Sequence, residues 1–209
     1  ALQAALLAGA EDLPSHLRLR VLEFAAGASE LPRTLLDTLP EDRLDYVLAL
    51  PDEESAARQQ AEYADFANLA VATLNTASWK LDANTPLPAV FDVVIVRHVL
   101  HKALDANTAL SQTKNWLAAG GRLFVAERHA DWGADFIEGL DPDWWHDAAL
   151  PDLELGPPGS CLLPPEAWEA ALREKGFDDL QRFTEPAAEG LAEGAYLVLA
   201  RRPQSETLT

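Results

Sequence analysis

The chain has 209 residues, enough for one domain with a well-buried core. Its 16 basic and 34 acidic residues give a formal net charge of −18, which argues against nucleic acid or an anionic membrane surface as a partner, because Lys and Arg make those contacts. No apolar run reaches the roughly 18 residues of a membrane span, and the first residues lack the basic region of a secretory signal. The single cysteine, Cys161, excludes an internal disulfide framework and a thiolate metal cluster. We therefore expect a cytoplasmic protein without a metal site.

Strand-like apolar runs alternate with segments of helical spacing along the chain. Strands are predicted at residues 19–24, 44–50, 69–74, 91–96, 122–126, 179–183 and 195–200. Helices are predicted at residues 30–39, 52–66, 105–118 and 165–175. This alternation predicts an α/β sheet with helices on both faces.

Punctuating residues mark where some of these helices begin and end. Asp52 is a plausible N-cap for the second helix. We expect Gly120 and Gly121 to end the third helix and Gly176 to end the last one, as C-terminal glycines do. Residues 131–160, rich in Trp, Asp, Pro and Gly, predict a long irregular loop or lid.

The most informative segment is VLEFAAGAS at residues 21–29. An apolar run carries an acid, Glu23, and small residues lead from Ala25 to Ser29 before a helix begins. A glycine-rich turn between strand and helix lets the backbone approach a ligand and directs a helix N-terminus at it. Only Gly27 is a glycine here, where such turns often have three, so the segment predicts an altered nucleotide-binding turn.

Five segments together carry a family resemblance. They are VLEFAAGAS (21–29), FDVVIVRHVLHKALD (91–105), WLAAGGRLFVAE (116–127), GLDPDWWHD (139–147) and CLLPPEAWEAALREKGFDD (161–179). In this order they resemble class I S-adenosylmethionine-dependent methyltransferases, and more closely the C-methyltransferase domains of polyketide synthases and the degenerate pseudo-methyltransferases of polyketide and fatty acid synthases. The resemblance implies a Rossmann-like α/β fold with a mostly parallel seven-stranded sheet, order 3-2-1-4-5-7-6, and a methyl donor over the ends of the first and fourth strands.

For the donor loop, the resemblance implies four binding positions. Glu23 matches the acid that ends the first strand in the family, and Gly27 matches the central glycine. Ala25 stands in place of the first glycine and Ser29 in place of the third, where a Cβ can crowd the donor or push φ away from positive values. A structural alternative for Glu23 is a cap or an ion pair near the helix start.

The rest of the implied donor site departs from the family pattern. A carboxylate should end the second strand and bind both ribose hydroxyls, but Leu50 stands there, and unpaired buried hydroxyls cost roughly 1–3 kcal/mol each. Asp52 is the candidate substitute, with a helix N-cap as the alternative. Asn75 is the candidate for the adenine amino group, with a strand-end turn as the alternative.

On the acceptor side, the resemblance implies a His–Glu pair, His101 and Glu127, at the ends of neighbouring strands. C-methylation of a β-ketoacyl thioester needs a base, and a carboxylate that fixes the histidine tautomer supports that role. A surface histidine at a helix start is the alternative for His101, and His98 and His129 are weaker candidates. The segment with Trp144, Trp145 and His146 either lines an acyl tunnel or packs a lid onto the sheet.

These positions lead to a functional expectation. We expect residues 1–203 to form one methyltransferase-like domain, with 204–209 as a tail or linker. Because no methionine occurs, even at position 1, we expect this domain to be excised from a larger polyketide or fatty acid synthase. Active relatives carry a sizeable helical lid before the first strand, whereas about 18 residues precede it here. Ser29 and Leu50 favour an impaired S-adenosylmethionine site and a structural or vestigial role.

Two alternatives remain open. The first is an active C-methyltransferase that acts on the α-carbon of a β-ketoacyl thioester bound to a carrier protein. The second is another class I methyltransferase that acts on oxygen, nitrogen or a small free molecule. The cofactor is S-adenosylmethionine if the site binds it and otherwise none. The expected partners are an acyl carrier protein and neighbouring synthase domains in the same polypeptide.

Overall fold

A computed structural model of the chain describes residues 2–82, 86–130, 132–140, 144, 162–184 and 194–204. Several features predicted from the sequence fall wholly or partly outside these ranges. Trp145, His146 and Cys161 lie outside the described residues, as do most of the predicted loop at 131–160 and all but the first residue of the tail at 204–209.

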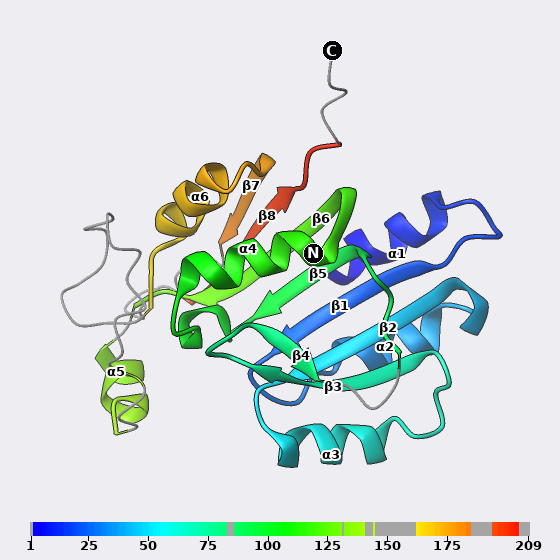
Figure 1. Ribbon diagram of the computed structural model, residues 1–209, viewed down its shortest axis with the longest axis horizontal. Coiled ribbons are helices and arrows are strands. Elements are labelled where there is room, and N and C mark those ends of the chain that lie inside the picture. The colour runs from blue at the N-terminus through cyan, green and yellow to red at the C-terminus, as the bar shows by residue number, and fades with distance from the viewer. Residues whose placement is uncertain are drawn as a thin grey trace.

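One sheet runs through the described part of the chain (Figure 1). Its strands are β1 (Leu19–Ala25), β2 (Leu44–Leu50), β3 (Leu69–Asn75), β4 (Lys80–Asp82), β5 (Phe91–Arg97), β6 (Leu117–Arg128), β7 (Asp178–Thr184) and β8 (Ala195–Arg201). Their order is β4-β3-β2-β1-β5-β6-β8-β7. β1, β2, β3, β5 and β6 pair in parallel, whereas β8 runs antiparallel to both β6 and β7.

The predicted order of seven strands is confirmed with one addition. The additional strand, β4, has three residues and pairs antiparallel with the end of β3. Its sequence, Lys-Leu-Asp, carries one apolar residue, so the apolar pattern could not reveal it. The fold is therefore the expected class I arrangement with an eighth, short edge strand.

Helices cover both faces of this sheet and bury two separate cores. They are α1 (Leu2–Asp12), α2 (Leu31–Thr38), α3 (Glu53–Glu62), α4 (Ala106–Trp116), α5 (Trp132–Glu138) and α6 (Pro165–Glu174), with short 3-10 turns η1 (Glu41–Arg43) and η2 (Leu100–Lys102). One core joins α4 and α6 to the sheet. The other joins α1, α2 and α3 to the opposite face, so that α4 lies in front of the sheet and α2 behind it in Figure 1.

Two helices were missed by the sequence pattern. α1 is apolar almost all round its axis and has no charged residue in its first turn, so neither a face nor a start is marked. It is fixed by tertiary burial of Leu6 and Ala10. α5 lies within the segment predicted to be irregular, and its seven residues are too few to show a helical period.

The predicted role of Gly120 and Gly121 as a helix end is wrong. α4 ends at Trp116, and both glycines lie inside β6. Gly120 has a φ of +78°, and a Cβ on Gly121 would lie 2.9 Å from the Ala118 oxygen and 3.1 Å from the Asp92 oxygen. The glycines therefore serve the irregular start of the β5–β6 pairing, where the register shifts.

The other helix-end predictions hold. Gly176, with a φ of +74°, follows α6, and its amide donates to the Arg173 oxygen. Asp52 is the N-cap of α3, and its side chain accepts a hydrogen bond from the Ser55 amide at 2.7 Å. α3 itself ends at Glu62, earlier than predicted.

Candidate functional site

The direction of strand order reverses between β1 and β5. The chain leaves β1 toward β2 on one side and later returns to β5 on the other. Ligands of open α/β sheets bind outside the carboxyl ends of the strands at such a point. Ala25 and Arg97 are paired there, as the last residues of their strands, and the Ala26 amide donates to the Arg97 oxygen at 3.2 Å.

Glu23 is the centre of a buried polar network at this edge. Its carboxylate is fully enclosed. One oxygen accepts from the Ser29 hydroxyl at 2.8 Å and from Arg97 Nε at 2.9 Å, and the other accepts from the Tyr46 hydroxyl at 2.7 Å. Burial, and then the nearby Glu23 charge, raise the pKa of Tyr46 well above its usual value, so the phenol keeps the proton that it donates.

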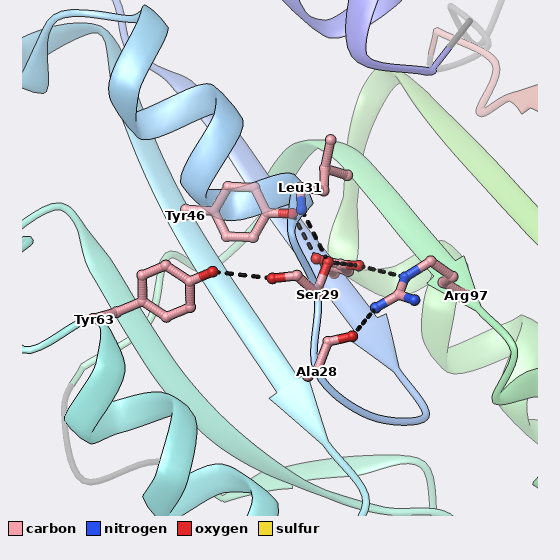
Figure 2. A network of polar contacts seen from close by, with 7 residues as sticks. Ala28, Ser29, Leu31, Tyr46, Tyr63 and Arg97 are labelled. Atoms are coloured by element: carbon pink, nitrogen blue, oxygen red, sulfur yellow. Dashed lines mark hydrogen bonds and ion pairs between the residues drawn. The ribbon is translucent and has the colours of Figure 1, made fainter.

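Ser29 faces into the protein, as Figure 2 shows. It is 7% exposed, and its hydroxyl also accepts from the Leu31 amide at 3.3 Å, at the start of α2. The Tyr63 hydroxyl, just beyond α3, donates to the Ser29 carbonyl at 3.0 Å. Ser29 is not among the described non-glycine residues with positive φ, so a serine fits this turn without backbone strain.

Arg97 adds a second tie to the loop. Besides its ion pair with Glu23, the guanidinium donates from Nη2 to the Ala28 carbonyl at 3.1 Å (Figure 2). Ala28 and Gly27 lie between these fixed points, and a Cβ on Gly27 would meet no atom within 4 Å. The loop at residues 26–29 is thus held from β5 and from the residue that follows α3.

The remaining predicted donor residues make local contacts. Leu50 is fully buried in the core under α2 and α3. Asp52 is exposed and caps α3, and the hydrogen bond from the Ser55 amide lowers the pKa of its carboxyl. Asn75 is exposed, and its Oδ1 accepts from the Ser78 amide at 2.9 Å. Both structural alternatives, the helix cap and the strand-end turn, are therefore formed, and the predicted ribose and adenine contacts stay predictions.

His101 and Glu127 lie together on the acceptor side. His101 is in η2 just after β5, and Glu127 is near the end of the neighbouring β6. The imidazole Nδ1 lies 2.8 Å from Glu127 Oε2, and the two residues are 5% and 1% exposed. Glu127 Oε1 also accepts from the amides of Leu100 at 3.0 Å and of His101 at 3.4 Å.

This geometry fixes the imidazole. An ionised carboxylate can only accept hydrogen bonds, so it selects the tautomer with the proton on Nδ1 and leaves the lone pair on Nε2. A histidine held in this way can remove a proton through Nε2, while the carboxylate stabilises the imidazolium that forms. His101 is therefore not the surface histidine that was the structural alternative.

Trp144 covers this histidine. Its ring packs edge-on against the His101 ring, with centroids 5.5 Å apart, and Trp144 is 7% exposed. The indole Nε1 donates to Asp135 in α5 at 3.0 Å. Trp144 of the predicted lid segment thus packs onto His101, and the predicted acyl tunnel stays a prediction.

The two other candidate histidines differ in their surroundings. His98 has a positive φ of 53°, and its Nδ1 is buried with no hydrogen-bond partner among the described residues. Burial lowers the pKa of His98. His129 packs edge-on against Tyr196, 4.9 Å between ring centroids, and lies outside the dyad.

Sequence reasoning missed Arg97, Tyr46 and Tyr63. Arg97 carried a signal, since it is a charged residue at the carboxyl end of a buried, β-branched strand. The two tyrosines carried none, because each lies in an otherwise ordinary apolar or helical segment.

In the described residues, no group of three His, Cys, Asp or Glu side chains could hold a metal ion. None of the helices described here has the length and apolar character that crossing a membrane requires.

Comparisons with known proteins find methyltransferases. A family described as "Methyltransferase domain" matches residues 22–123. The chain is 26% identical over 184 residues to the highly reducing polyketide synthase sthA of Phaeosphaeria nodorum, which covers 84% of this chain and 6% of the synthase. It is 28% identical over 174 residues to the methyltransferase calH of Penicillium decumbens, which covers 79% of this chain and 45% of that protein.

Solved structures give the same result. The CurJ carbon methyltransferase superposes with a TM-score of 0.76 at 26% identity and covers 97% of this chain and 53% of that one. CalH in complex with SAH has the same fold, with a TM-score of 0.69 at 22% identity over 88% of this chain and 51% of that one. The chain thus spans less than a tenth of the synthase and about half of each methyltransferase. Together, the strand order and these matches show that the chain carries a methyltransferase domain of the class I fold, related to the methyltransferase domains of polyketide synthases.

Proposed function

We propose that this is a methyltransferase-like domain of a polyketide or fatty acid synthase with an impaired S-adenosylmethionine site and a structural or vestigial role. One observation carries the proposal. Leu50, fully buried at the end of β2, offers no hydrogen-bonding group where a ribose would need a carboxylate. Two unpaired ribose hydroxyls would cost roughly 1–3 kcal/mol each, a loss of one to several orders of magnitude in affinity.

The other donor-side groups support the same proposal. Both oxygens of Glu23 already accept hydrogen bonds from side chains of the protein. Asp52 and Asn75 each accept from a backbone amide three residues further along the chain. A donor molecule would have to compete with these contacts.

A second candidate function is favoured by the His101–Glu127 pair. In an active C-methyltransferase, His101 Nε2 would take the α-proton of a β-ketoacyl thioester. The resulting enolate carbon would attack the methyl group of the sulfonium, so that a C–C bond forms and the S–CH₃ bond breaks, leaving a neutral thioether. The buried 2.8 Å contact between Nδ1 and Oε2 supports this role.

Neighbouring synthase domains and an acyl carrier protein are the proposed partners. The relatives are segments of large synthases, which supports neighbours within one polypeptide. The net charge of −18 disfavours a strong charge-based interface with an acidic carrier protein. Tethering in one chain would raise the effective concentration without such an interface.

Calorimetric titration with S-adenosylmethionine tests the proposal. We expect no binding at millimolar donor, that is, a binding free energy weaker than about −4 kcal/mol. Tight binding, with methyl transfer to a β-ketoacyl pantetheine that His101→Ala abolishes and the exposed-site control His16→Ala retains, would overturn it in favour of the active enzyme. Preferential methylation of small free acceptors would instead indicate another class I methyltransferase.

A further inference from the structure

Arg97 joins the two strands that flank the switch point. It is the last residue of β5 and is paired with Ala25, the last residue of β1. Its Nε lies 2.9 Å from the enclosed carboxylate of Glu23, and its Nη2 lies 3.1 Å from the carbonyl of Ala28. One side chain of β5 thus ties together strand β1 and the loop that follows it.

The position of this side chain matters more than its contacts alone. Parallel strands of an open sheet direct their ligands to the carboxyl edge at the switch point. Arg97 leaves β5 at that edge and crosses toward the loop after β1, as Figure 2 shows. The Arg97 side chain is 27% exposed and the Glu23 side chain is 0% exposed, so the ion pair joins a partly exposed cation to an enclosed carboxylate.

Charge adds a second argument. A guanidinium is a permanent cation, and a sulfonium donor also carries a positive charge at the atom that gives up its methyl group. Glu23 is a buried acid at this edge that could offset a cationic ligand, and its charge is already paired with Arg97. Because this ion pair is neutral overall, Glu23 has no charge left to offset that of a cationic donor entering here.

We propose that Arg97 acts as an autoinhibitory contact that closes the donor loop at residues 26–29 over the switch point and excludes the cationic donor. The inference rests on the proposed impairment of the donor site and names the side chain that causes part of it. Leu50 weakens ribose binding, whereas Arg97 blocks the end of the site where the sulfonium would lie.

The test compares Arg97→Ala with Arg20→Ala. Arg20 on β1 makes a similar ion pair with Asp92 on β5, at 2.7 Å, but at the opposite end of the same two strands. Calorimetry with S-adenosylmethionine should give no binding for the wild type and for Arg20→Ala. For Arg97→Ala we expect a dissociation constant at least about tenfold lower than the highest donor concentration at which the wild type shows no binding. Hydrogen exchange at residues 26–29 should also become faster in Arg97→Ala alone.

The outcomes separate the two proposals. Donor binding by the wild type would overturn both. No binding by Arg97→Ala, with faster exchange in the loop, would overturn the role of Arg97 and leave the impaired site standing. If Arg97→Ala does not fold because Glu23 is left as an unpaired buried charge, the double variant Glu23→Gln/Arg97→Ala replaces it. That variant keeps an uncharged hydrogen-bonding group at position 23, and it is compared with Glu23→Gln alone. Equal amide exchange at residues 26–29 in the two variants would overturn the role of Arg97.

Discussion

Replacing Glu127 by glutamine should reverse the tautomer of His101. In the wild type, the carboxylate accepts from Nδ1 through Oε2 and from two backbone amides through Oε1. A glutamine has one oxygen and one NH₂ group. Since the oxygen is needed by the backbone amides, the NH₂ group faces Nδ1, which must then accept. The proton moves to Nε2, and the base is lost.

The structure gives the size of this preference. The opposite amide orientation would leave the buried amides of Leu100 and His101 without an acceptor. The contact to Leu100, at 3.0 Å, is the firmer of the two. An unsatisfied buried donor costs roughly 1–3 kcal/mol, which corresponds to a preference between about fivefold and about 150-fold. The reversed tautomer should therefore predominate in Glu127→Gln.

Long-range ¹H–¹⁵N NMR of the neutral imidazole, at about pH 9 and so well above the usual histidine pKa of about 6.5, measures the tautomer directly. His101→Gln assigns the signal, and Glu174→Gln, an exposed residue of α6, is the control. A proton on Nδ1 in both the wild type and Glu127→Gln would refute the reasoning. If the domain is active, the same variant should lower the rate of methyl transfer by about 10²–10⁴.

Three further predictions concern stability. Gly121→Ala should lower the free energy of unfolding by about 1–3 kcal/mol, because its Cβ would press on two backbone oxygens. Gly9→Ala in α1 should instead raise the free energy of unfolding by about 0.5–1 kcal/mol. Equal effects of the two variants in urea unfolding would contradict the packing described. Asp52→Ala should cost about 0.5–2 kcal/mol and Asp52→Asn much less, because asparagine also caps, and a similar loss in both would show that the charge matters more than the cap. Burial lowers the pKa of His98, so folding favours its neutral form. The resulting stability is complete above the unfolded pKa of about 6.5 and is lost as the pH falls through that value toward the folded pKa. Between about pH 7.5 and 5.5, thermal unfolding should show a smaller loss of stability in His98→Gln than in the wild type, and identical profiles would contradict this account.

The sequence predicted the main sheet because its strands are long apolar runs. β2 was predicted at its observed bounds, and the other main strands were predicted within one or two residues except β6, which begins at Leu117 rather than at residue 122. β4 and α1 were missed for a shared reason: neither carries a local signal, and each exists because of what it packs or pairs against. Gly120 and Gly121 were assigned to a helix end because sequence cannot show that β5 approaches so closely.

Residues of the candidate site were predictable only where a family motif has a particular residue type at a particular position. The family resemblance marked His101 and Glu127, and the neighbouring strands β5 and β6 bring them together. The contacts of Arg97 with Glu23 and Ala28 were not predictable, because they depend on the register of β1 against β5. The contribution of Tyr63, from beyond α3, depends on how that helix packs.

The place of β8 inside the sheet has a consequence for biosynthesis. β8 lies between β6 and β7, and β7 is joined to the sheet only through it. Translation at about 5–20 residues per second therefore exposes β6 as an open edge for some seconds before Ala195–Arg201 leaves the ribosome. Until then Glu127, which is paired with Tyr196 in the finished sheet, lies on that open edge. A nascent chain stalled before β8 would present the edge of β6 to any neighbouring strand, a known route to aggregation.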